Sequence, residues 1–71
     1  MDPKDVAELL DAVESLTYQG CTRAADGTLY SGCLWAFADG LRLLEKHGRV
    51  RIVRGDGRNI WAQPVPPEPT R

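Results

Sequence analysis

Apolar residues recur at three- and four-residue spacing near the start of the chain, which predicts an amphipathic helix from about residue 3 to residue 18. Asp2 and Pro3 suit the cap and the first position of that helix, and Gly20 suits its end. The predicted apolar stripe consists of Val6, Leu9, Leu10, Val13 and Leu16.

A second periodic stretch predicts a helix from about Leu29 or Ser31 to His47, ended by Gly48. Its apolar face consists of Cys33, Leu34, Phe37, Ala38, Leu41 and Leu44. Its opposite face carries Trp35, Asp39, Arg42 and Lys46, and the three-residue spacing of Asp39 and Arg42 suits an ion pair. Residues 21–28 are expected to form a loop, with a turn at Asp26-Gly27.

The segment from residue 49 to residue 62 predicts a β-hairpin. A three-residue loop, Gly55-Asp56-Gly57 with Gly57 in the left-handed conformation, sets Arg54 opposite Arg58. This register gives one apolar face, consisting of Val50, Ile52, Ile60 and Ala62. It sets Arg51 opposite Trp61, where a cation–π contact is expected. The competing two-residue turn at Asp56-Gly57 mixes apolar and polar residues on each face.

These elements predict a small single α+β domain with two main helices followed by a C-terminal antiparallel hairpin. The domain is expected to span residues 1–63. Residues 64–71 contain four prolines, which predict an extended, flexible tail. A chain of 71 residues buries only about 60% of its surface on folding, so a partner or a second copy would help to stabilise it, although the sequence requires neither.

Composition favours a cytoplasmic globular protein, since 42% of the residues are hydrophobic and no apolar run is long enough to span a membrane. The first residues lack the features of a secretory leader. In a reducing compartment Cys21 and Cys33 are expected as buried thiols. With His47 as the sole histidine and no CxxC pair, no metal site, cofactor or enzymatic activity is expected.

Charge is distributed unevenly along the chain, although the formal net charge is only −1. Residues 1–40 contain seven acidic and two basic residues, whereas residues 41–61 contain six basic and two acidic ones. The basic residues of the second segment are Arg42, Lys46, Arg49, Arg51, Arg54 and Arg58. Arginine binds phosphate in a bidentate manner, so this segment is a candidate nucleic-acid contact. A solvated face that protects a small sheet from edge pairing is the alternative.

Residues 41–62, a leucine-lined helix end, Gly48 and an arginine-bearing hairpin turning near Gly57, resemble the last third of a winged helix-turn-helix domain. The resemblance implies a small bacterial or phage DNA-binding protein that regulates transcription. The helix before the hairpin presents Asp39 and lacks the polar residues that recognise base edges. The sequence therefore predicts contact with the phosphates of duplex DNA through the six basic residues above.

Two further hypotheses concern protein contacts. Trp35 and Trp61 lie among charged residues, as interface anchors do, which suggests a protein-interaction module such as a phage- or plasmid-type accessory protein. Packing of the two indoles within the domain is the alternative. Gly32, Ala36 and Gly40 recur every four residues and suggest a close helix contact in a homodimer.

Overall fold

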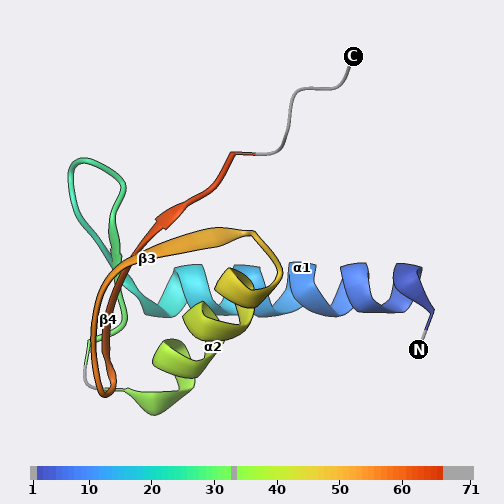
Figure 1. Ribbon diagram of the computed structural model, residues 1–71, viewed down its shortest axis with the longest axis horizontal. Coiled ribbons are helices and arrows are strands. Elements are labelled where there is room, and N and C mark those ends of the chain that lie inside the picture. The colour runs from blue at the N-terminus through green and yellow to red at the C-terminus, as the bar shows by residue number, and fades with distance from the viewer. Residues whose placement is uncertain (1, 33, 67–71) are drawn as a thin grey trace.

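The computed structural model, which describes residues 2–32 and 34–66, confirms a small α+β domain (Figure 1). Helix α1 lies along the longest axis of the molecule, α2 crosses it, and the hairpin of strands β3 and β4 curves around α2. In the described part of the chain the strands form one antiparallel sheet in the order β1-β2-β4-β3.

Helix α1, Pro3–Gly20, begins as the sequence predicts and extends two residues beyond the predicted end. The Asp2 carboxylate caps it by accepting a hydrogen bond from the Lys4 amide at 3.1 Å. The predicted stripe is only partly buried: Leu10 is in the core and Val13 packs against it, whereas Leu9 and Leu16 are exposed.

The segment between the helices forms two short strands, so the predicted loop at residues 21–28 is partly wrong. Strand β1, Thr22–Arg23, pairs with β2, Leu29–Tyr30, which in turn pairs with β4. The turn signal was correct, because the Asp26 carboxylate accepts the Thr28 amide at 2.9 Å and Gly27 has a φ of +90°. A strand of two residues is too short to show a period, which is why the pattern did not reveal it.

Helix α2, Trp35–Lys46, begins later than predicted, because Leu29 and Tyr30 belong to the sheet. Ala38, Leu41 and Leu44 of the predicted apolar face are fully buried, but Leu34 precedes the helix and is exposed. Cys33 lies outside the described residues. The helix ends as expected: Gly48 has a φ of +75°, and its amide donates to the Glu45 carbonyl.

Strands β3, Val50–Asp56, and β4, Asn59–Pro64, form the predicted hairpin with a different register. Asp56 pairs with Asn59, so the loop has two residues, Gly57 and Arg58, and both predicted turns are wrong in their boundaries. Gly57 does adopt the expected left-handed conformation, with a φ of +58°. A positive φ at the first loop position is typical of a hairpin turn whose twist matches that of the strands.

A β-bulge at Val53 restores the predicted faces of the hairpin. Arg54 pairs with Trp61 and Ile52 pairs with Ala62, which leaves Val53 without a partner. As predicted, the inner face carries Val50, Ile52, Ile60 and Ala62. These side chains join Leu29 and the buried face of α2 in the core.

The predicted stripe of small residues, Gly32, Ala36 and Gly40, is not continuous, and Gly40 packs against α1 of the same chain. Gly32 precedes α2 and has a φ of +69°, so it is not part of a helical stripe. A Cβ atom on Gly40 would lie 2.4 Å from the Thr17 Oγ1 atom, and one on Gly20 would lie 1.9 Å from the Phe37 ring. The two glycines therefore permit the close crossing of α1 and α2.

The sheet extends into the predicted tail. Strand β4 includes Pro64, and the Val65 amide donates to the Arg49 carbonyl at 3.0 Å. The expected flexibility of residues 67–71 concerns positions outside the described residues.

Candidate nucleic-acid interface

The six basic residues predicted to bind nucleic acid lie in different environments, and Arg49 is the most constrained. Its Nη1 atom lies 2.6 Å from a carboxylate oxygen of Asp11 and 3.0 Å from one of Glu14, both on α1. These hydrogen bonds raise the pKa of the Arg49 guanidinium, which stays charged in any case. Arg49 thus joins the acidic helix to the hairpin, and its charge is already balanced.

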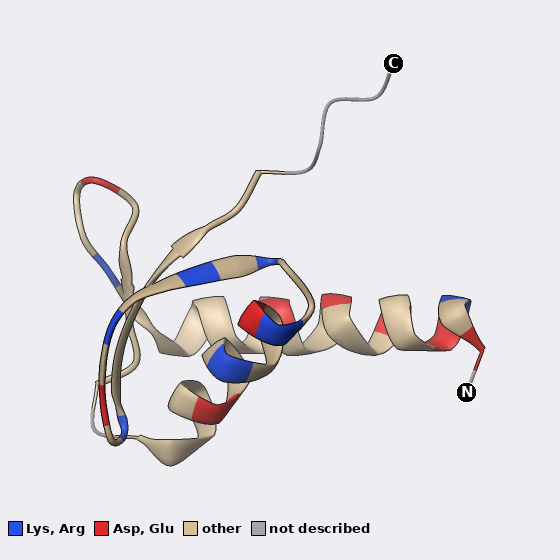
Figure 2. Cartoon of the chain, in the orientation of Figure 1, with Lys and Arg blue, Asp and Glu red and all other residues tan. Residues whose placement is uncertain are grey.

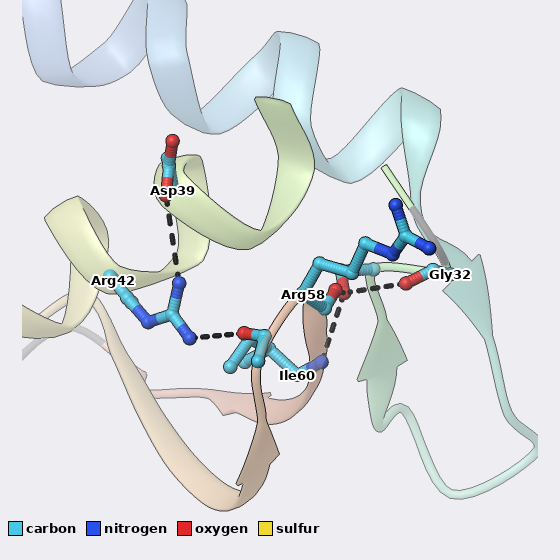
Figure 3. Close-up of polar contacts among 7 residues, drawn as sticks. Gly32, Asp39, Arg42, Arg58 and Ile60 are labelled. Carbon is cyan, nitrogen blue, oxygen red and sulfur yellow. Dashed lines mark hydrogen bonds and ion pairs between the residues drawn. The ribbon is translucent and has the colours of Figure 1, made fainter. Parts of the chain in front are cut away.

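Arg42 is also held within the molecule (Figure 3). Its guanidinium forms the predicted ion pair with Asp39 at 3.6 Å and donates a hydrogen bond to the Gly57 carbonyl in the hairpin turn. Because Asp39 and the Gly57 carbonyl both occupy its guanidinium, Arg42 stabilises the tip of the hairpin and is less available than a free cation to bind a phosphate. Lys46, one turn later, has no ion-pair partner among the described residues.

The outer face of the sheet, opposite α2, carries an aromatic–arginine stack made of Tyr30, Trp61 and Arg54. The Tyr30 and Trp61 rings are 4.7 Å apart at an interplanar angle of 16°, and the Arg54 guanidinium lies 4.9 Å from the Trp61 ring centre. Each ring contact adds roughly 0.5–1.5 kcal/mol beyond burial alone. Trp61 lies on β4 between its two neighbours, so the stack crosses three strands.

The stack corrects two predicted contacts. Arg54, and not Arg51, covers Trp61, because the loop is Gly57-Arg58 and not the predicted Gly55-Asp56-Gly57, which shifts the pairing next to the turn by three residues. Arg54 does not face Arg58, which lies in the turn. Arg51 instead donates to the Gln63 side-chain carbonyl at 3.0 Å on the same outer face. That bond is to a neutral group, so Arg51 retains its unbalanced charge.

Ser31 fixes the position of the hairpin turn and was not recognised in the sequence. Its hydroxyl donates to the Arg58 carbonyl at 2.7 Å and accepts the Ile60 amide at 2.9 Å (Figure 3). The side chain is buried although it is polar. A lone serine after an unrecognised strand gives no pattern that distinguishes it from a surface residue.

Charge segregation is visible in the folded chain: acidic residues predominate on α1, and most basic residues lie on α2, β3 and the hairpin turn (Figure 2). Within the described residues, Arg51, Arg54 and Arg58 have no carboxylate within ion-pair distance. All three are exposed, on one hairpin. The structure thus divides the predicted site into a balanced pair, Arg42 and Arg49, and an unbalanced group on the hairpin.

The two tryptophans are not brought together. Trp61 is half-buried in the stack, whereas Trp35 begins α2 and is 54% exposed. Trp61 is therefore accounted for by packing within the domain. The anchor hypothesis rests on Trp35, beside the equally exposed Leu34.

The described part of the chain shows no cluster of three or more histidine, cysteine or acidic side chains that could hold a metal ion. Cys21 is half-buried, and burial raises the pKa of its thiol, which reduces the reactive thiolate fraction at neutral pH. Contact between the two cysteines concerns Cys33, which lies outside the described residues. Burial is likewise the main cause of the raised pKa of Tyr18.

Among the described residues no helix is both long enough and apolar enough to cross a lipid bilayer. Comparison with protein-family models, with curated proteins and with solved structures gives no match for this chain.

Proposed function

We propose that this chain is a small, non-enzymatic, cytoplasmic nucleic-acid-binding protein that contacts phosphate through Arg51, Arg54 and Arg58. The observation that carries the proposal is the group of three exposed arginines on one hairpin, none of which has a carboxylate within ion-pair distance in the described part of the chain. The resemblance of residues 41–62 to a wing favours duplex DNA and a role in regulating transcription.

The hairpin is suited to this contact because two of its three cations are held by contacts on the outer face of the sheet. Stacking on Trp61 limits the rotamers of Arg54, and the bond to Gln63 does the same for Arg51. A side chain that is already ordered loses less conformational entropy when it binds a phosphate. Lys46 and Arg42 add positive charge from α2 but need not touch the nucleic acid.

The test is a fluorescence-anisotropy titration of labelled duplex DNA and of one of its strands, at 50 mM and 200 mM salt. Three phosphate contacts give a salt slope of about −2.7, so affinity for the duplex should fall about 40-fold between the two salt concentrations. The Arg51→Gln/Arg58→Gln variant should lose most of both the affinity and the slope.

The matched control is Lys4→Gln/Arg23→Gln, which removes the same charge from α1 and β1. It should reduce the affinity much less than the hairpin variant does. Equal losses in the two variants, or no binding of either nucleic acid at 50 mM salt, would exclude this interface. Tighter binding of the single strand than of the duplex would show that the hairpin binds single-stranded DNA and not duplex DNA.

Interaction with another protein is the rival function, favoured by the exposed Leu34 and Trp35 at the start of α2. If Trp35 is an anchor, a partner should shield it from acrylamide quenching of its fluorescence, measured in a Trp61→Phe background. The homodimer hypothesis loses one of its supports, since Gly40 already faces Thr17 in the same chain.

A further inference from the structure

An apolar groove of about 560 Å³ runs between α1 and α2. Apart from Thr17 and Gln19, its walls are apolar residues or glycines on both helices: Val13, Leu16 and Gly20 on α1, and Ala36, Phe37 and Gly40 on α2. Leu16 is 67% exposed at its rim, and Leu9, two turns earlier on the same side of α1, is 50% exposed. Apolar surface in this arrangement is typical of a groove that receives an amphipathic helix.

The groove has a defined shape because the two helices cross closely. Gly40 lies against Thr17, and Gly20 lies against the Phe37 ring. With no side chain at either glycine, Phe37 can lie against α1 and form part of the floor. The groove is thus a consequence of ordered packing between the helices.

The groove and the exposed Leu9 and Leu16 form one apolar strip, and acidic residues lie beside it on both helices. Asp5 precedes Leu9 by four residues, and Glu8 precedes Leu16 by eight, so both lie beside the strip on α1. Neither has a basic partner within ion-pair distance among the described residues. On α2, Asp39 lies one turn after Ala36, and its carboxylate is held loosely by Arg42 at 3.6 Å.

We propose that this groove binds an amphipathic helix of a partner protein whose apolar face is flanked by lysine or arginine. The occupant follows from charge complementarity, because an apolar strip beside the unpaired carboxylates of Asp5 and Glu8 on α1 favours a basic helix over an acidic one. A second copy is a poorer occupant through this face, since it would bring two acidic α1 helices together. The surface is separate from the arginines of the hairpin, so the inference does not depend on nucleic-acid binding.

The test uses two designed 18-residue helical peptides with the same leucine face, one flanked by lysines and the other by glutamates. Each is titrated into the full-length, isotope-labelled chain and followed by amide chemical shifts. The lysine peptide should shift resonances of Leu16, Gly20 and Phe37 and bind at least ~10-fold more tightly than the glutamate peptide. Leu16→Ser should weaken binding ~10-fold, and Asp5→Asn/Glu8→Gln should remove most of the preference for lysine.

Val53→Ser is the control, since Val53 is also exposed and apolar but lies on the hairpin. It should leave the binding of the lysine peptide unchanged. Leu16 is largely solvated, so Leu16→Ser is expected to fold, which its amide spectrum will show directly. Three outcomes would overturn the proposal: no shifts in the groove, equal affinity for both peptides, or self-association that Leu16→Ser abolishes.

Discussion

Individual arginines in this chain differ in role although the sequence presents them alike. The side chain of Arg49 is 27% exposed and bridges two carboxylates of α1, whereas Arg58, nine residues later, is exposed and has no carboxylate within ion-pair distance in the described part of the chain. The count of basic residues in a segment therefore overestimates the charge available to a polyanion. The decisive information is the location of the acids of α1, which are more than thirty residues away in sequence.

Replacing Arg49 should destabilise the fold because it removes two ion pairs that connect α1 to the hairpin. For Arg49→Gln we expect the free energy of unfolding to fall by about 1 kcal/mol at low salt, and by less in 1 M NaCl. Urea denaturation at the two salt concentrations measures this. Arg58→Gln, the matched control, should change stability little, and a salt-independent loss in Arg49→Gln would show that packing of the side chain, and not charge, is responsible.

The residues of the stack show how far the sequence determines a contact. Alternation along the strands correctly separated Val50, Ile52, Ile60 and Ala62 from the outward residues. It could not predict that Arg54 covers Trp61, because that pair depends on which residues form the loop, and the bulge at Val53 then shifts the pairings beyond it once more. The face on which a residue lies follows from the alternation along the strand, which the sequence shows. The residue that it pairs with depends on the register, which the turn and the bulge set.

At the level of elements, caps and stops were predictable and short strands were not. Asp2, Pro3 and Gly48 mark helix ends through local chemistry, and the structure confirms all three. Strand β2 depends on pairing with β4, which lies about thirty residues further along the chain, and β1 in turn pairs with β2. The missed strand also explains the late start of α2, since Leu29 is buried in the sheet and not in a helix.

The crossing of α1 and α2 should depend on the missing side chain at Gly40. In Gly40→Ala the new methyl group would meet Thr17 Oγ1 at 2.4 Å. We expect a loss of about 1–3 kcal/mol in unfolding free energy, although alanine favours a helix over glycine by about 1 kcal/mol. Chemical denaturation of the single variant measures the net effect.

Thr17→Ala provides the control for the crossing. If the clash is the cause, the Gly40→Ala/Thr17→Ala double variant should be more stable than the sum of the two single losses predicts. Additive losses would mean that Gly40 acts through something other than its contact with Thr17.

In the whole molecule, the core lies between α2 and the inner face of the sheet, and α1 is attached at one side. Leu29, Leu41, Leu44 and Ile60 are almost fully buried, whereas the first buried side chain of α1 is Leu10. The first two turns of α1 extend beyond the other elements (Figure 1). Local stability should therefore decrease from the core toward the start of α1.

Amide hydrogen exchange measures this gradient. The amides of Leu41 and Leu44 should exchange at the rate of global unfolding, whereas those of Ala7 and Glu8 should exchange at least ~100-fold faster through local opening. Similar protection along α1 and α2 would show that the start of α1 is stabilised by a contact, which binding of a helix in the groove would provide.

The bulge at Val53 also sets how this hairpin tolerates changes in chain length. Because Val53 has no partner, its deletion leaves Ile52 opposite Ala62 and Arg54 opposite Trp61, and both faces are kept. The bulge thus gives β3 one position at which the loss of a residue keeps the rest of the pairing.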